Sequence, residues 1–312
     1  MTNGGKIVME DQACLLCGSA RVAVRQNSLG DVEEGLPGEY TIGQCAECEL
    51  VFLARRPCGA SLPECYGDSY HAVAARRYRG FSGVLYDLRY YFRYRQLQAW
   101  FPKGSLRILE IGCGDAKLLL AMEKALGDRA ELLGLDYAVA AIALPANSKI
   151  KLIQGDIQTA PIEGKFDVIL MFDVLEHLAD PVGCLTRIRR GLKAGGLLIG
   201  QVPNWNSLWR RVFPRCWSGL QVPRHMSFFT PATLRKTLAK GGFDNVRLKP
   251  VFDPGDLSVS LCNWLVRRRR WPGKPRGLKI YIPLTLAAAP VVALQNMLGD
   301  SGAIFFVAKL PS

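Results

Sequence analysis

The sequence predicts an α/β protein in which a mostly parallel sheet follows a small, cysteine-rich N-terminal module. Apolar strand-like runs alternate with helical segments between residues 105 and 251, which is typical of a sheet covered by helices on both faces. The first run, 107–111, leads directly into the glycine turn Gly112-Cys-Gly114. Four cysteines ahead of this region lie in two Cys-x-x-Cys pairs. The glycine turn and the cysteine pairs are the features that point to chemistry.

The elements of the large domain follow one another in a regular order. We expect strands over residues 107–111, 131–135, 151–153, 166–172, 196–202, 246–251 and 303–309, and helices over 117–126, 138–143 and 181–192. A further helix should begin with Thr230 as its N-cap and Pro231 in its first turn, and should end at Gly241. An insertion, 203–229, precedes this helix.

Composition divides the chain into four parts. They are a zinc-ribbon-like module (1–57), a helical linker or lid (58–104), the sheet domain (105–252) and a basic, apolar C-terminal segment with a closing strand (253–312). The lid is rich in tyrosine and arginine, and we expect it to lie over the open end of the sheet domain. His71 would then line, from that side, the pocket for the molecule on which the protein acts.

The paired cysteines have the spacing of a metal site. Thiolates at Cys-x-x-Cys spacing reach one ion, and two such pairs complete a closed tetrahedral zinc site of structural type: Cys14, Cys17, Cys45 and Cys48. Unliganded buried thiols are the alternative. Disulfides explain the pattern less well, because residues 1–11 are polar and lack the apolar core of a secretory signal. We therefore expect a cytoplasmic protein.

The chain is strongly basic, with a net charge of +13 and a pI near 9.4. Such a balance favours polyanionic partners: nucleic acid, an anionic membrane face or phosphorylated substrates. The apolar segment 280–298 contains Pro283 and Pro290 and falls short of an uninterrupted membrane span. Because a run of arginines, 267–270, precedes it, peripheral association with the anionic inner face of a membrane is one expectation.

Glycines and acidic residues follow the successive strands, at the strand ends where open α/β sheets bind ligands. Gly112 and Gly114 would let the backbone approach a ligand closely. Lys117 replaces the third glycine of a dinucleotide fingerprint, which counts against pyrophosphate binding. Asp136 is placed to accept the hydroxyls of a ribose, and Asp156 to accept an adenine amino group. Strand-end turns that bind no such cofactor are the alternative.

Two neighbouring residues complete this expected site: Glu110 would fix the loop or meet an amino group, and Ile157 would offer its backbone amide. Together these motifs resemble those of class I S-adenosylmethionine-dependent methyltransferases over about residues 105–250, as do the segments 172–181 and 195–200. The resemblance implies a Rossmann-like sheet, S-adenosylmethionine as the cofactor and methyl transfer as the activity. It also implies that Asp173 and His177 line the methionine end of the cofactor.

The cysteine module ahead of such a domain resembles a bacterial subgroup associated with sugar, polysaccharide and secondary-metabolite pathways. This implies a small-molecule or glycan acceptor, such as a sugar, a lipid-linked saccharide or a related metabolite, methylated on oxygen or carbon. An RNA methyltransferase that holds phosphates with its basic residues is a disfavoured alternative, because the Asn-Pro-Pro-Tyr type of motif is absent. A non-catalytic binding module is disfavoured by the intact cofactor motifs.

Only three histidines are available as a general base for the acceptor. His225 lies in a segment similar to the His-x-x-Phe-Ser/Thr segment of zinc-containing sugar methyltransferases, although Arg224 replaces their glutamate. We expect His225 to be the base, with a purely structural histidine as the alternative. His177, with Glu176 and Asp173, resembles a Glu-His segment that binds a divalent metal in some quinone-biosynthetic O-methyltransferases. A helix-capping role for His177 is the simpler interpretation.

Overall fold

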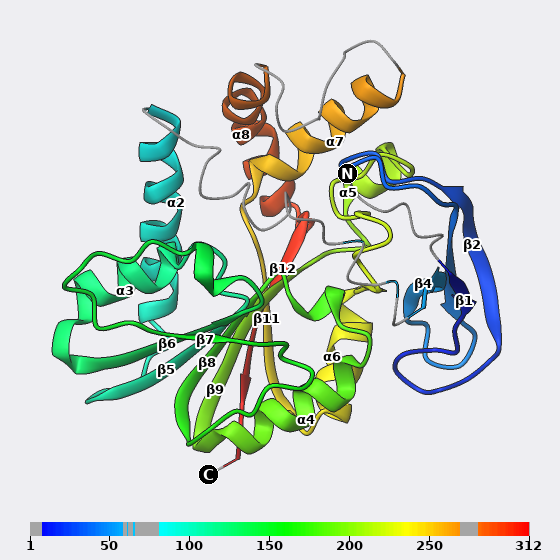
Figure 1. Cartoon of the computed structure of the whole chain (residues 1–312). Coiled ribbons are helices and arrows are strands. Elements are labelled where there is room, and N and C mark those ends of the chain that lie inside the picture. Colours follow the sequence, from blue (N-terminus) through cyan, green and yellow to red (C-terminus); the bar gives the residue numbers. More distant parts are fainter. Residues whose placement is uncertain (1–7, 59–60, 62–64, 66–80, 269–279, 312) are drawn as a thin grey trace.

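A computed structural model describes residues 8–58, 61, 65, 81–268 and 280–311 of the chain. Within these residues the backbone forms one sheet of seven strands and one of five. Figure 1 shows the larger sheet with helices on both faces, and the smaller sheet beside it. The predicted α/β class is confirmed.

The seven-stranded sheet has the order β11-β12-β9-β8-β5-β6-β7. Its strands are β5 (Leu106–Ile111), β6 (Ala130–Asp136), β7 (Lys151–Gln154), β8 (Phe166–Phe172), β9 (Leu192–Pro203), β11 (Asn245–Pro250) and β12 (Ala303–Lys309). The pairs among β5 to β9 are parallel, whereas β12 runs antiparallel to both β9 and β11. The chain proceeds outward from β5 to β6 and β7 on one side, and through β8 and β9 on the other. Open sheets bind ligands at such a switch point, beyond the carboxyl ends of the strands.

Helices cover the two faces of this sheet (Figure 1). They are α2 (Phe81–Gln98) and α3 (Lys117–Leu126) on one face, and α4 (Pro181–Gly191) and α6 (Pro231–Lys240) on the other. Successive side chains of β5 point to opposite faces of the sheet. Ile108 packs in the hydrophobic cluster that includes α3, and Leu109 packs in the cluster that includes α4. Because the strand is buried on both faces, it appears in the sequence as a continuous apolar run.

Local capping signals fix where two of these helices begin. Thr230 and Thr233 form a reciprocal capping box at the start of α6, as the predicted N-cap requires. Asp180 caps α4 by accepting the Gly183 amide at 2.9 Å. The helix predicted over 138–143 is wrong, because this stretch forms only the short 3-10 turn η4 (Val139–Ala141). Pro145 follows closely, and so short a run cannot offset the cost of helix nucleation.

The smaller sheet joins the N-terminal module to the insertion after β9. Its strands are β1 (Met9–Asp11), β2 (Val22–Leu29), β3 (Tyr40–Cys45), β4 (Val51–Pro57) and β10 (Ser227–Phe228). β10 comes from the insertion and pairs antiparallel with Phe52 and Val51 of β4. The two units also share a core, in which Phe52 belongs to the same cluster as Leu234 and Leu238 of α6.

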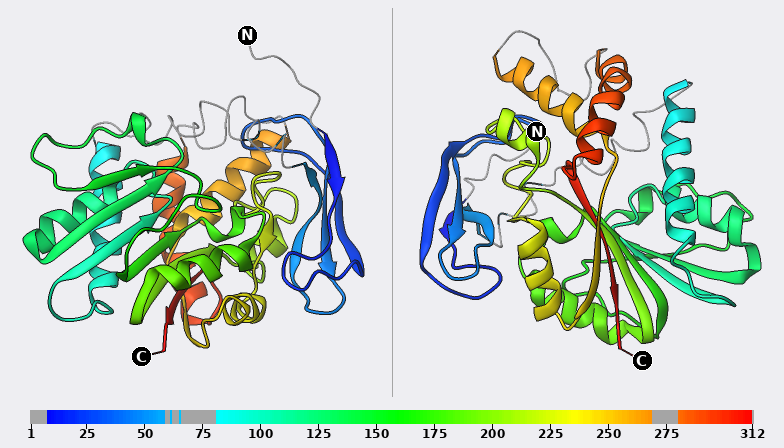
Figure 2. Two further views of the ribbon diagram at one scale, coloured as in Figure 1. Left: turned by 60° about the horizontal axis from the view of Figure 1, so that its bottom comes forward. Right: turned by 180° about the vertical axis from the view of Figure 1, so that it is seen from behind.

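The C-terminal region adds three helices: α5 (Leu208–Val212), α7 (Pro254–Arg267) and α8 (Tyr281–Met297). α7 and α8 pack against each other and project beyond one end of the large sheet (Figures 1 and 2). This is the ligand end, because α8 leads into β12, whose first residue Ala303 pairs with Pro203 at the end of β9. Among the described helices, none is both long and apolar enough to cross a membrane.

Candidate active site

The turn after β5 folds over the end of β6. Gly112 has a φ of 69°, and its amide donates to the Leu135 carbonyl at 2.8 Å. A Cβ at this position would lie 2.5 Å from Cγ2 of Val174, so only glycine fits without displacement. Gly114, with a φ of 55°, donates its amide to Oδ2 of Asp136 at 2.9 Å. The predicted glycines and Asp136 are therefore directly connected.

Glu110 is the buried acid at the end of β5. Its Oε2 has no hydrogen-bond partner among the described residues. Burial raises the pKa of Glu110 to about 8, the Arg93 guanidinium lowers this pKa, and the carboxylates of Asp115 and Asp136 raise it. A buried acceptor atom with no donor suits an ammonium group. Glu110 thus fits the methionine amino group of S-adenosylmethionine, which would supply an electrophilic methyl group at this end of the sheet.

Asp156 and Ile157 follow β7, next to Asp136. Asp156 accepts the Gln158 amide at 2.7 Å, while Ile157 is buried. Tyr137, which the sequence analysis missed, forms a side-chain hydrogen bond with Asp156, and burial followed by this bond raises the pKa of Tyr137. An aromatic residue directly after the expected ribose-binding aspartate was the available signal. The nucleoside roles of Asp136, Asp156 and Ile157 stay predictions.

A chain of polar side chains links α2 to the ends of β8 and β9. Arg93 of α2 donates to Oε1 of Gln201 at 3.3 Å, and Nε2 of Gln201 donates to Oδ1 of Asp173 at 3.1 Å. The Arg93 guanidinium also lies over the Phe172 ring, 4.4 Å from its centroid. Arg93 and Gln201 were missed, because neither belongs to a recognisable motif. His71 lies outside the described residues.

His177 and His225 lie in edge-to-face contact, with ring centroids 4.5 Å apart. His177 belongs to the turn η5 (Leu175–His177) after β8, and His225 precedes β10 in the insertion. Nδ1 of His225 lies 2.8 Å from the Gly219 carbonyl, which can only accept, so this nitrogen carries the proton. In the neutral ring Nε2 is then left as the basic nitrogen. Burial lowers the pKa of His177 to about 3.

Glu176 completes a buried cluster with these two histidines. Both of its carboxylate oxygens lack a hydrogen-bond partner among the described residues, and burial, then the charge of Asp173, raises the pKa of Glu176. One ligand atom each from Glu176, His177 and His225 lie within 4.8 Å of one another. Two imidazoles and a carboxylate form a donor set that suits a divalent transition metal.

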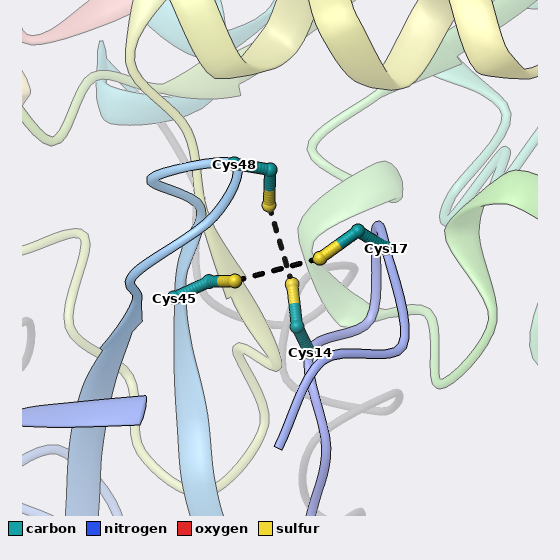
Figure 3. A group of neighbouring side chains, drawn as sticks. All are labelled: Cys14, Cys17, Cys45 and Cys48. Atoms are coloured by element: carbon teal, nitrogen blue, oxygen red, sulfur yellow. Dashed lines mark hydrogen bonds between the residues drawn. The ribbon is translucent and has the colours of Figure 1, made fainter. Parts of the chain in front are cut away.

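The four paired cysteines converge in the N-terminal module (Figure 3). The sulfurs of Cys14 and Cys48 lie 3.4 Å apart, as do those of Cys17 and Cys45, and all four lie within 4.8 Å of one another. Tetrahedral zinc–thiolate bonds of about 2.3 Å require sulfur separations of about 3.8 Å. The Glu47 amide also points at the Cys45 sulfur, at 3.4 Å. The donor set and its spacing fit a zinc ion.

Comparison with known proteins addresses the central region. A family model described as "Methyltransferase domain" matches residues 76–248. The Ubiquinone biosynthesis O-methyltransferase of Cereibacter sphaeroides strain ATCC 17029 is 35% identical over 203 residues, which cover 56% of this chain and 78% of that protein. The Demethylmenaquinone methyltransferase of Staphylococcus carnosus is 29% identical over 114 residues, covering 35% of this chain and 47% of that one.

Solved structures agree with the sheet topology. Phosphoethanolamine N-methyltransferase 2 of Haemonchus contortus, in complex with S-adenosyl-L-methionine, has a TM-score of 0.51 at 15% identity, covering 84% of this chain and 63% of that one. This likeness concerns the fold alone. The family match and the Cereibacter sphaeroides relative extend the likeness to activity: the chain belongs to the methyltransferase-domain family and is a class I S-adenosylmethionine-dependent methyltransferase.

Proposed function

We propose that this enzyme methylates an oxygen or carbon atom of a small-molecule or glycan acceptor that is carried on a lipid. The observation that supports this best is the position of His225, which the insertion brings against His177 at the ligand end of the sheet. The relatives named Ubiquinone biosynthesis O-methyltransferase and Demethylmenaquinone methyltransferase are consistent with an acceptor of this kind. The strongly basic C-terminal region, next to the same end of the sheet, favours an acceptor held at an anionic membrane.

The chain's own residues would divide the work between cofactor and acceptor. Gly112 and Gly114 allow close approach of the cofactor, Glu110 pairs with its ammonium group, and Asp136 and Asp156 hold its ribose and adenine. Asp173 and His177 line its methionine end. Nε2 of His225 takes the proton from the acceptor atom as that atom attacks the methyl group, while the Gly219 carbonyl holds Nδ1–H and fixes the ring.

The role of His225 is tested by His225→Asn, assayed with labelled S-adenosylmethionine on the acceptor pool of a cell extract. We expect methyl transfer to fall at least about a hundredfold while cofactor affinity is unchanged. Ser227→Ala is the matched control, because its buried hydroxyl has no hydrogen-bond partner among the described residues and its loss should be tolerated. Full activity of His225→Asn would show that His225 is not the base. Label that enters nuclease-sensitive RNA would favour the RNA alternative over the lipid-carried acceptor.

The buried cluster of Glu176, His177 and His225 favours a second candidate, a quinone-type O-methyltransferase in which these residues would hold a divalent metal that would supply Lewis-acid polarisation of the acceptor hydroxyl. The two candidates differ in what Glu176→Gln removes. In the metal candidate, this variant loses a bound divalent ion together with activity. In the base candidate, wild-type activity persists in a chelator that leaves the cysteine-bound zinc in place. A structural zinc at Cys14, Cys17, Cys45 and Cys48 is part of both.

A further inference from the structure

The outward face of α8 is apolar along its whole length. Its exposed side chains include Leu286, Leu294 and Met297, which are 60%, 58% and 84% exposed, and Leu298, directly after the helix, is 78% exposed. The opposite face, with Ala288 and Val292, is buried. From Tyr281 to Met297 the helix contains no charged residue. A surface helix ordinarily turns a polar face to water, so this one exposes a surface of the kind that marks an interaction site.

The sequence that precedes this helix is also strongly basic. Between residues 257 and 299 the sequence has seven Lys and Arg residues and no Asp or Glu, so this stretch supplies +7 of the chain's net charge of +13. Arg267 and Arg268, at the end of α7, are exposed. An apolar helix face that follows a strongly basic stretch of sequence has the two properties that bind a helix to an anionic membrane surface.

The charge also decides between the possible occupants of this face. A second copy of the chain would bring one strongly basic stretch of sequence toward another, and like charges repel. An anionic bilayer attracts the same charge while it buries the exposed leucines. No described helix could cross the bilayer, so the contact would lie in the interface.

We propose that the outward face of α8, together with Arg267 and Arg268 at the end of the neighbouring helix α7, docks the enzyme on an anionic lipid bilayer. The docking itself does not depend on the proposed function. Only its role, which is to bring the enzyme to a lipid-carried acceptor, rests on that function. β12 follows α8 and begins opposite Pro203, at the carboxyl end of β9, so the docked helix is connected directly to the cofactor end of the sheet. Docking would then bring a lipid-carried acceptor near that end.

Sedimentation with vesicles tests the apolar part. Wild-type enzyme should bind phosphatidylcholine vesicles that contain phosphatidylglycerol, and should be released by salt. The double variant Leu286→Asp/Leu294→Asp should bind about a hundredfold more weakly. Val24→Asp is the matched control, because Val24 is 63% exposed on the distant strand β2 and should not affect binding. Equal binding by wild type and the double variant would overturn the proposal.

A second pair of variants tests the charge. Arg267→Gln/Arg268→Gln should weaken binding to the anionic vesicles several-fold, by roughly 1 kcal/mol of attraction per residue. Lys103→Gln/Lys124→Gln removes the same charge elsewhere and should have no such effect. Wild-type dimerisation that Leu286→Asp/Leu294→Asp abolishes, without vesicle binding, would assign the face to a second copy instead. Calorimetry with S-adenosylmethionine should give the same affinity for every variant, so failure of docking and failure of the cofactor site are separable.

Discussion

Arg224 and Asp31 form a two-pronged ion pair, with distances of 2.9 Å from Nη1 to Oδ2 and 3.2 Å from Nη2 to Oδ1. Each side chain is only 1% exposed. Arg224 directly precedes His225 in the insertion, whereas Asp31 lies in the loop between β2 and β3 of the N-terminal module. The same carboxylate accepts the amides of Glu33 and Leu36. The pair therefore ties the module to the segment that carries the proposed base.

Asp31→Ala should destabilise the protein by about 3–5 kcal/mol, because it leaves the Arg224 guanidinium buried without its counter-charge. Thermal unfolding measures this loss. Asp128→Asn is the control: Asp128 pairs with Lys149 at the surface, where both side chains are at least 80% exposed, and unfolding should not change measurably. Adding Arg224→Met to Asp31→Ala should recover part of the loss. No recovery would mean that Asp31 acts mainly through its loop amides.

Binding of S-adenosylmethionine at pH 7 should release close to one proton from Glu110. The pKa of this buried carboxyl is about 8 in the free protein, and an ammonium partner favours the ionised form. Calorimetry in buffers of different ionisation enthalpy measures the release. Glu110→Gln should abolish the release and weaken binding roughly tenfold or more. Proton release that survives in Glu110→Gln would assign it to another group.

Glu110 also makes stability depend on pH. Its folded-state pKa, about 8, lies above the unfolded value of 4.5, so its contribution is complete below pH 4.5 and is lost as the pH rises through 8. Wild-type protein should therefore lose stability relative to Glu110→Gln over this interval. Denaturant titrations of both proteins at several pH values measure the difference, and a constant difference would contradict the buried, protonated carboxyl.

Gly112→Ala should reduce cofactor affinity sharply, because its Cβ would meet Val174 at 2.5 Å in a backbone conformation that alanine disfavours. Gly127→Ala shares the strain, with a φ of 52°, but has no atom within 4 Å of the added Cβ. It should lower the melting temperature slightly and leave cofactor binding intact. Equal loss of binding in both variants would trace the effect to general destabilisation.

Cys17→Ser should reduce bound zinc below one per chain and lower the melting temperature. Cys17 is exposed, so its packing contributes little and the metal accounts for the change. Metal analysis and thermal unfolding measure the two effects. Cys58→Ser, outside the cluster, should retain the full zinc content. Stoichiometric zinc in Cys17→Ser would refute a four-thiolate site.

The features predicted correctly from the sequence are encoded locally. The helix start at Thr230 and the strand over 166–172 each depend on neighbouring residues, through a capping box in one case and a doubly buried apolar run in the other. The turn at Gly112 and Gly114 was expected for the same reason, and both glycines have a positive φ, while their role toward the cofactor stays a prediction. Each pattern lies within a few positions of the element that it specifies, so no long-range contact was needed to find it.

The features that were missed depend on contacts between distant residues. Nothing near Arg224 indicates that it is buried, because its partner Asp31 lies 193 positions away. β10 has two residues, too few to show a period, and exists because β4 offers an edge. Arg93 and Gln201 meet across 108 positions. Such pairs are invisible to reasoning that uses short windows of sequence.

The pairing of β10 with β4 has a consequence for synthesis of the chain. β4 ends at Pro57 and β10 begins at Ser227, 170 positions later (227 − 57). At typical translation rates, about 10–30 s separate the two strands as they leave the ribosome. During that interval the module has its four cysteines but not its last strand, and the edge of β4 is open to unwanted pairing. Zinc bound early would hold the hairpin of β3 and β4 closed until β10 has been synthesised.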